Sequence, residues 1–141
     1  MEVSDMAYVF TKDLETGIAA IDSQHREIFE KMNSLANACA QGAGRQEIAN
    51  MLDFLNNYIA KHFGDEEKMH AQYNYPERVK HKNYHENFKL TVNELIKEYR
   101  SDGATIALVG KLNSKVGMWL LTHIKREDGA FGAYLKNKNG Q

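Results

Sequence analysis

Apolar residues recur at alternating steps of four and three along four segments of this chain, which is the spacing of one face of a helix. The segments cover approximately residues 21–39, 48–69, 81–99 and 109–123. Turn-forming residues separate them: Gly42 and Gly44, then Asn74-Tyr75-Pro76, then Ser101-Asp102-Gly103. Four helices joined by short turns predict an all-α fold, an antiparallel up-down-up-down four-helix bundle.

The 141 residues suit a single domain, 1–141, that can bury a core without disulfides. Residues 1 to about 17 lack helical periodicity and are predicted to form an N-terminal arm across the bundle. We expect Tyr8, Val9, Phe10 and Leu14 to anchor this arm. The bundle is expected over about 18–132, followed by a polar tail from Lys136 to Gln141.

Charge and composition exclude several classes of protein. Eighteen basic and 19 acidic side chains give a net charge of -1, without the basic stripe of a nucleic-acid-binding protein. No apolar run approaches the roughly 18–20 residues of a membrane span, and the N-terminus shows no signal-peptide pattern. The single cysteine, Cys39, excludes an intramolecular disulfide and fits a reducing compartment. We expect a soluble, cytoplasmic monomer.

Seven side chains that can bind metal ions lie on the apolar faces of the predicted helices. Five of the six histidines belong to this set, and histidine is the commonest metal ligand in proteins. An unpaired carboxylate in an apolar core costs several kcal/mol, and a bound cation would remove that cost. The candidate ligands are His25, His62, Glu66, His81, His85, His123 and Asp128.

The candidate ligands are also predicted to lie at one level of the bundle. In antiparallel helices, residues equidistant from a turn lie side by side. His25 lies about 18 residues before the first turn and His62 about 19 after it, and the other ligands agree to about one helical turn at 1.5 Å per residue. Core packing alone does not predict that agreement.

Spacing within each helix brings the ligands into pairs. His62 with Glu66, and His81 with His85, are four residues apart and share a helix face. His123 and Asp128 are five apart, so this pair needs a long reach, a loosened last turn or a π-type bulge. Glu127, four residues after His123, is a rival carboxylate that spacing does not exclude.

Five histidines and two carboxylates exceed the needs of one ion and suit two. Nitrogen and oxygen ligands fit Fe, Zn, Mn or Ni, and the absence of cysteine ligands disfavours an iron–sulfur or structural zinc site. With both carboxylates bridging, the side chains supply nine bonds, whereas two six-coordinate ions need twelve. A bridging oxide or hydroxide supplies two more, which leaves one position for an exogenous ligand.

These residues resemble the hemerythrin family, in particular its single-domain bacterial members, over residues 17–128. The resemblance rests on Gly17-Ile18, Ile21-Asp22-Ser23-Gln24-His25, His62-Phe63-Gly64-Asp65-Glu66-Glu67, Tyr75-Pro76, His81-Lys82-Asn83-Tyr84-His85 and Trp119-Leu120-Leu121-Thr122-His123-Ile124 with Asp128. It implies a non-haem centre of two Fe ions with an oxo or hydroxo bridge, which binds dioxygen reversibly. It also implies Asp128 rather than Glu127, through the family's His-x4-Asp spacing.

The resemblance also implies individual roles. His81, His85 and His123 would hold one iron, His25 and His62 the other, and Glu66 and Asp128 would bridge them. The open position would belong to the two-histidine iron, beneath a hydrophobic pocket formed by Ile28, Phe63, Trp119, Leu120 and Ile124. Phe10 stands where many relatives have tryptophan.

The function expected is oxygen storage, transport or delivery to an oxygen-requiring enzyme, by a protein that is not itself an enzyme. A di-iron oxidase or ferroxidase is one alternative, but that class uses repeated Glu-x-x-His pairs that this chain lacks. An oxygen- or nitric-oxide-sensing module and a zinc- or nickel-handling module are others. Outside the set, His70 is expected at the surface or rim, and Asp65, Glu67 and Lys68 on a solvated face.

Overall fold

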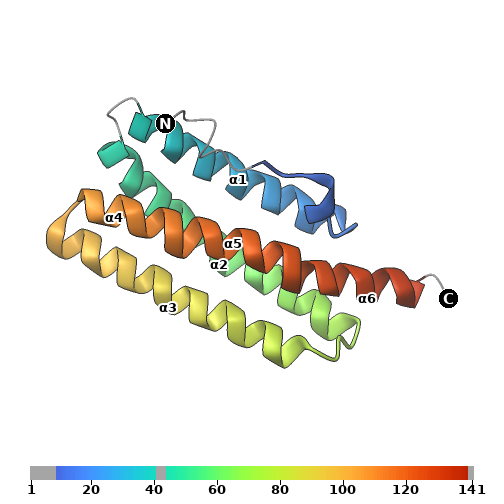
Figure 1. Ribbon diagram of the computed structural model, residues 1–141. Helices are drawn as coiled ribbons and strands as arrows, with labels where there is room; N and C mark the ends of the chain where they lie inside the picture. Colours follow the sequence, from blue (N-terminus) through green and yellow to red (C-terminus); the bar gives the residue numbers. More distant parts are fainter. Residues whose placement is uncertain (1–8, 41–43, 140–141) are drawn as a thin grey trace.

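Four long helices make up the protein in a computed structural model, which describes residues 9–40 and 44–139 (Figure 1). The first three are α1 (Ala19–Ala40), α2 (Gly44–Gln72) and α3 (Arg78–Asp102). The fourth is continuous but uneven: α4 (Ile106–Lys111), α5 (Met118–His123) and α6 (Gly129–Asn139) alternate with the π-helical turns η3 (Leu112–Gly117) and η4 (Ile124–Asp128). The predicted all-α bundle is confirmed.

The predicted apolar faces meet in one core along most of the bundle. Ile28, Leu55, Val92 and Leu112 come from the four helices and are each fully buried. The helices that pack side by side are consecutive in the chain, α1 with α2, α2 with α3 and α3 with α4. This is the arrangement that short turns impose on antiparallel helices.

The turns are closed by local hydrogen bonds. Between α2 and α3, the backbone N–H of Tyr75 donates to the carbonyl of His70 at 2.9 Å. Between α3 and α4, Gly103 adopts a φ of +78°, which glycine allows without a steric cost, and its N–H donates to the carbonyl of Tyr99. Thr105 then caps α4 by accepting a 3.0 Å hydrogen bond from the N–H of Leu108.

The fourth helix is longer than the sequence indicates. Helix α6 continues to Asn139, so residues 136–139 of the polar tail are helical. Phe131 and Leu135 lie one turn apart on α6 and are buried against Ile21 and Tyr75 in a second apolar cluster. This cluster closes the end of the bundle at which the α2–α3 turn lies.

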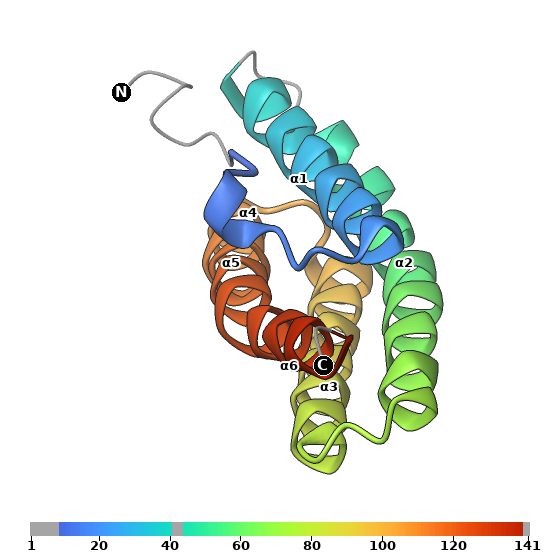
Figure 2. The same ribbon diagram turned by 90° about the vertical axis from the view of Figure 1, so that its right-hand side faces the viewer.

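The N-terminal arm lies across the bundle and reaches the start of α1 (Figure 2). Its 3₁₀ turn η2 (Lys12–Leu14) packs against η4, with Leu14 buried and Phe10 partly buried against the core. Val9 is 66% exposed, so its predicted anchoring role is wrong. Tyr8 lies outside the described residues.

Hydrogen bonds to one carboxylate fasten the end of the arm. Asp22 of α1 is buried and accepts from the N–H and hydroxyl of Thr16 at 2.8 and 2.7 Å, and from the N–H of Gly17 at 3.2 Å. On its other side the arm approaches α6 so closely that a Cβ at Gly132 would lie 2.3 Å from the carbonyl oxygen of Thr16.

Among the helices of the described ranges, none combines the length and the apolar character needed to cross a membrane.

Candidate metal centre

All seven candidate ligands lie together inside the bundle. Each is at most 3% exposed. They come from every long helix: His25 from α1, His62 and Glu66 from α2, His81 and His85 from α3, His123 from α5 and Asp128 from η4. The predicted common level is therefore what the structure shows.

The seven side chains form two overlapping groups. In one, single ligand atoms of Glu66, His81, His85, His123 and Asp128 all lie within 4.8 Å of one another. In the other, the same holds for His25, His62, Glu66 and Asp128. Only the two carboxylates belong to both groups. The arrangement is that of two adjacent cation sites with Glu66 and Asp128 between them.

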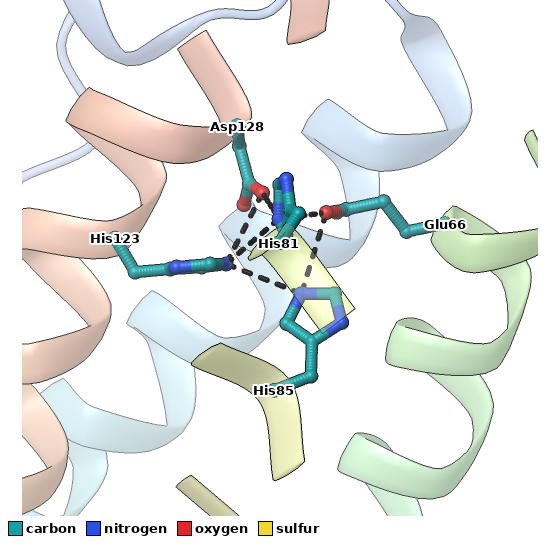
Figure 3. Close-up of side chains that lie close together, drawn as sticks. All are labelled: Glu66, His81, His85, His123 and Asp128. Atoms are coloured by element: carbon teal, nitrogen blue, oxygen red, sulfur yellow. Dashed lines mark hydrogen bonds and ion pairs between the residues drawn. The ribbon is translucent and has the colours of Figure 1, made fainter. Parts of the chain in front are cut away.

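The imidazoles present their Nε2 atoms to these carboxylates (Figure 3). The Nε2 of His81 lies 2.7 Å from Glu66 Oε1 and 2.9 Å from Asp128 Oδ1. The Nε2 of His123 lies 3.3 Å from Asp128 Oδ1, and that of His85 lies 3.4 Å from Glu66 Oε1.

The second group has the same orientation. The Nε2 of His25 is 3.0 Å from Asp128 Oδ2, and that of His62 is 3.5 Å from Glu66 Oε2. The two oxygens of each carboxylate therefore face different groups, as a bridging carboxylate requires.

A π-helical turn brings Asp128 inward. In an α-helix, residues five apart point about 140° away from each other. Over Ile124–Asp128 the helix is wound more widely, so that Asp128 faces the same centre as His123. Glu127 lies outside both groups and instead approaches the Nδ1 of His123 at 3.3 Å. The bulge required by the five-residue spacing is present.

Oxygen atoms outside the centre hold three of the imidazoles by their other nitrogen. The Nδ1 of His85 contacts Glu67 Oε2 at 2.8 Å, the Nδ1 of His123 faces Glu127, and the Nδ1 of His62 is hydrogen-bonded to the amide oxygen of Gln24. When a cation takes the Nε2 lone pair, the ring proton is on Nδ1, where these oxygens can accept it. Such outer partners fix both ring orientation and tautomer.

The buried carboxylates remain anionic. Burial and mutual repulsion raise the pKa of Glu66, but the imidazoles of His81 and His85 beside it outweigh them and bring it below its ordinary value. Burial likewise opposes ionisation of Asp128, yet the charge of His123 and the approach of three imidazoles hold its pKa well below the usual range. The centre therefore contains two buried anions.

The pKa values of the buried histidines are shifted in opposite directions. Burial lowers the pKa of His62 to about 4, so this ring is neutral at pH 7. Burial also opposes the charge on His81, but its close approach to the anionic Asp128 and Glu66 raises its pKa to about 9. Without a cation, a proton on His81 is what partly neutralises the two carboxylates.

Unpartnered polar atoms show that a cation suits this centre. Both oxygens of Glu66, both oxygens of Asp128 and both ring nitrogens of His25 are buried without a hydrogen bond of acceptable geometry. Buried polar atoms without partners are rare because each one costs free energy. A donor set of imidazole nitrogens and carboxylate oxygens around them fits first-row transition metals.

Two of the five side chains predicted to form a hydrophobic pocket cover ligand rings, and the pocket itself stays a prediction. Phe63 stacks on His85 with ring centroids 3.8 Å apart, and Trp119 stacks on His123 at 4.5 Å. Ile28, Leu120 and Ile124 are buried in the same core, against which Trp119 packs.

Two of the surface predictions are wrong. His70 is 1% exposed and lies against the centre, because Phe131 in the first turn of α6 covers it. Glu67 is 23% exposed and contacts His85 instead of facing water freely. The role of Gln24 was not predicted at all, since its contact joins residues 38 positions apart on different helices. Local spacing carries no signal for contacts of that kind.

Comparison with known proteins agrees with this geometry. The family model described as the hemerythrin HHE cation binding domain matches residues 16–135. A bacteriohemerythrin of Stenotrophomonas maltophilia is 31% identical over 128 residues, 91% of this chain and 81% of that protein. One from Pseudomonas aeruginosa is 32% identical over 87% of this chain and 78% of its own length. One from Methylococcus capsulatus is 30% identical over 85% and 89%.

Proposed function

Since this chain belongs to the hemerythrin family, we propose that its buried centre holds two iron ions and binds dioxygen reversibly, for storage, transport or delivery to oxygen-requiring enzymes. The observation that carries the proposal is the pair of overlapping ligand groups that share only Glu66 and Asp128. We further propose that the protein acts as a cytoplasmic monomer and is a binding protein rather than an enzyme.

In this proposal His81, His85 and His123 hold one iron, and His25 and His62 hold the other. Glu66 and Asp128 lie between the two groups and would be shared by both ions. Two ferrous ions held by these residues would supply the two electrons that reversible binding of dioxygen requires.

The side chains of this protein prepare the centre in two ways. Glu67, Glu127 and Gln24 hold the Nδ1 protons of three histidines, so that each Nε2 is directed inward before a cation arrives. Pre-set ligands lose little freedom on binding, which favours affinity.

The same core excludes bulk water. Phe63 and Trp119 cover two ligand rings, and Leu120 and Ile124 are nearly fully buried beside them. A dry site discourages the loss of partly reduced oxygen, which supports reversible binding over oxidation chemistry. A surface pocket of about 240 Å³ reaches His62 and offers a small molecule an approach to that side.

The test is to purify the protein, count metal per chain and record the visible spectrum during cycles between argon and air. We expect two irons and a colour change that reverses in every cycle. Zinc as the only metal, or a single irreversible oxidation, would refute the proposal.

A ligand variant makes the test specific. His62→Ala should lose one iron and dioxygen binding, because His62 is one of two histidines in its group. Lys61→Ala, at the exposed neighbouring position, is the matched control and should retain both. Equal iron content and oxygen binding in the two variants would contradict the ligand assignment.

A further inference from the structure

His70 is a buried histidine that the proposed ligand set does not use. It lies on α2 one turn after Glu66 and is 1% exposed. Neither of its ring nitrogens has a hydrogen-bond partner. A buried polar side chain with both nitrogens unpaired costs free energy, so its presence at this position calls for a physical explanation.

The surroundings of His70 direct one nitrogen toward the centre. Its Nε2 lies 3.7 Å from Glu66 Oε1. Aromatic rings enclose the imidazole: His81 and Phe131 with centroids 4.4 Å away, and Tyr75 at 5.2 Å. A carboxylate facing Nε2 favours the tautomer with its proton on that atom, since a lone pair there would be repelled.

His70 is not placed to be an eighth ligand. Its nitrogens belong to neither of the two groups of converging ligand atoms. The contact with Glu66 is therefore the route by which it can influence the centre.

The binding of a cation makes this contact more important. In the metal-free arrangement the Nε2 atoms of His81 and His85 lie 2.7 and 3.4 Å from Glu66 Oε1. A histidine that gives its Nε2 lone pair to a cation has no proton on that atom, so neither ring can donate to Glu66 any longer. His70, outside the ligand groups, keeps its N–H.

We propose that His70 is a positioning residue whose Nε2–H donates a hydrogen bond to Oε1 of Glu66 and so tunes the bridging carboxylate. This inference rests on the proposed di-iron centre. The present 3.7 Å exceeds a hydrogen bond by about 0.5–1 Å, a gap that rotation of the Glu66 carboxylate or the His70 ring closes.

The hydrogen bond has a defined electronic consequence. A donor to an anionic ligand withdraws negative charge from it, so the carboxylate stabilises ferric iron less. His70 thereby favours the ferrous state, the one that takes up dioxygen, and slows autoxidation.

The first experiment compares the reduction potentials of variants of the iron-loaded protein. His70→Met removes the donor at similar volume, and His70→Gln keeps an N–H. We expect His70→Met to shift the ferrous–ferric equilibrium about tenfold toward ferric, the lower end for a hydrogen bond to a charged group. Tenfold is about 59 mV for a one-electron couple. His70→Gln should remain close to the unsubstituted protein.

A packing control separates the hydrogen bond from the shape of the cavity. Phe131→Leu disturbs the aromatic cage around His70 but leaves the donor in place. A shift in Phe131→Leu as large as in His70→Met, or equal potentials for the methionine and glutamine variants, would overturn the proposal.

A second experiment does not depend on iron. In the zinc-substituted protein, which is diamagnetic, nitrogen-15 NMR reports which nitrogen of His70 carries the proton. We expect protonated Nε2, and a proton on Nδ1 alone would overturn the inference. A protein that fails to cycle with dioxygen but shows protonated Nε2 would refute the proposed function while leaving the contact between His70 and Glu66 intact.

Discussion

Gly132 is the point at which the N-terminal arm presses most closely on the fourth helix, and replacing it by alanine tests how the arm is held. The added Cβ would lie 2.3 Å from the carbonyl oxygen of Thr16 and 3.0 Å from two further backbone atoms of that residue. Carbon and oxygen are in ordinary contact at about 3.4 Å or more. Because the obstacle is backbone, the arm has to move by about 1 Å.

The expected cost follows from that movement. Overpacking of this kind destabilises by about 1–3 kcal/mol. A shift of Thr16 also strains its two hydrogen bonds to Asp22, each worth about 1 kcal/mol. The higher helix propensity of alanine offsets up to about 1 kcal/mol of this cost. We expect Gly132→Ala to lower the free energy of unfolding by about 2 kcal/mol.

Gly64 provides the matched control. It lies inside α2, and a Cβ built there meets no atom within 4 Å. Gly64→Ala should therefore show only the gain in helix propensity, about 0.5–1 kcal/mol. The two variants should differ by about 3 kcal/mol, or roughly 6–12 °C in Tm for a chain of this length.

The assay is thermal unfolding followed by circular dichroism at matched metal content, since bound metal stabilises the folded state by mass action. Gly132→Ala should melt below the unsubstituted protein and Gly64→Ala above it. If Gly132→Ala melts as high as Gly64→Ala, the close contact between the arm and α6 does not constrain the fold, and the reasoning is refuted.

Three further predictions concern the centre itself. Glu67→Gln should weaken metal binding about 10- to 100-fold, because His85 loses the carboxylate that holds its ring. Competition with a chelator measures the affinity. If Glu67→Gln binds metal as tightly as the exposed control Glu86→Gln, the prediction is contradicted. Leu120→Ser should speed autoxidation by admitting water to a site where Leu120 is 3% exposed; an unchanged rate, followed by absorbance, would count against its sealing role. Metal uptake at pH 8 should release a proton from His81, whose pKa in the metal-free protein is raised to about 9, so that affinity rises with pH up to that value. A zinc titration in weak buffer that releases no proton would contradict it.

The fold and the membership of the ligand groups were largely predictable from the sequence. A helix buries one face, so the periodic spacing of apolar residues located four helices and the turns between them. The same periodicity placed six of the seven ligands on buried faces, where only a strong interaction can stabilise them; Asp128 was implied by the family resemblance. Glu66 was the clearest case, because an anion in an apolar stripe requires a positive partner.

The His123–Asp128 pair marks the limit of that reasoning. Spacing left three geometries and the rival Glu127 open. The tertiary structure shows a π-helical turn over Ile124–Asp128 that directs Asp128 inward and places Glu127 against the outer nitrogen of His123.

Contacts between helices were decided by tertiary structure alone. The sequence determined which residues of each helix are buried, because that depends on a repeat of about 3.6 residues within one segment. It did not determine that Glu67 meets His85, that Gln24 meets His62, or that α6 covers His70. Those contacts depend on the rotation and length of neighbouring helices, and these are set only when all four pack together.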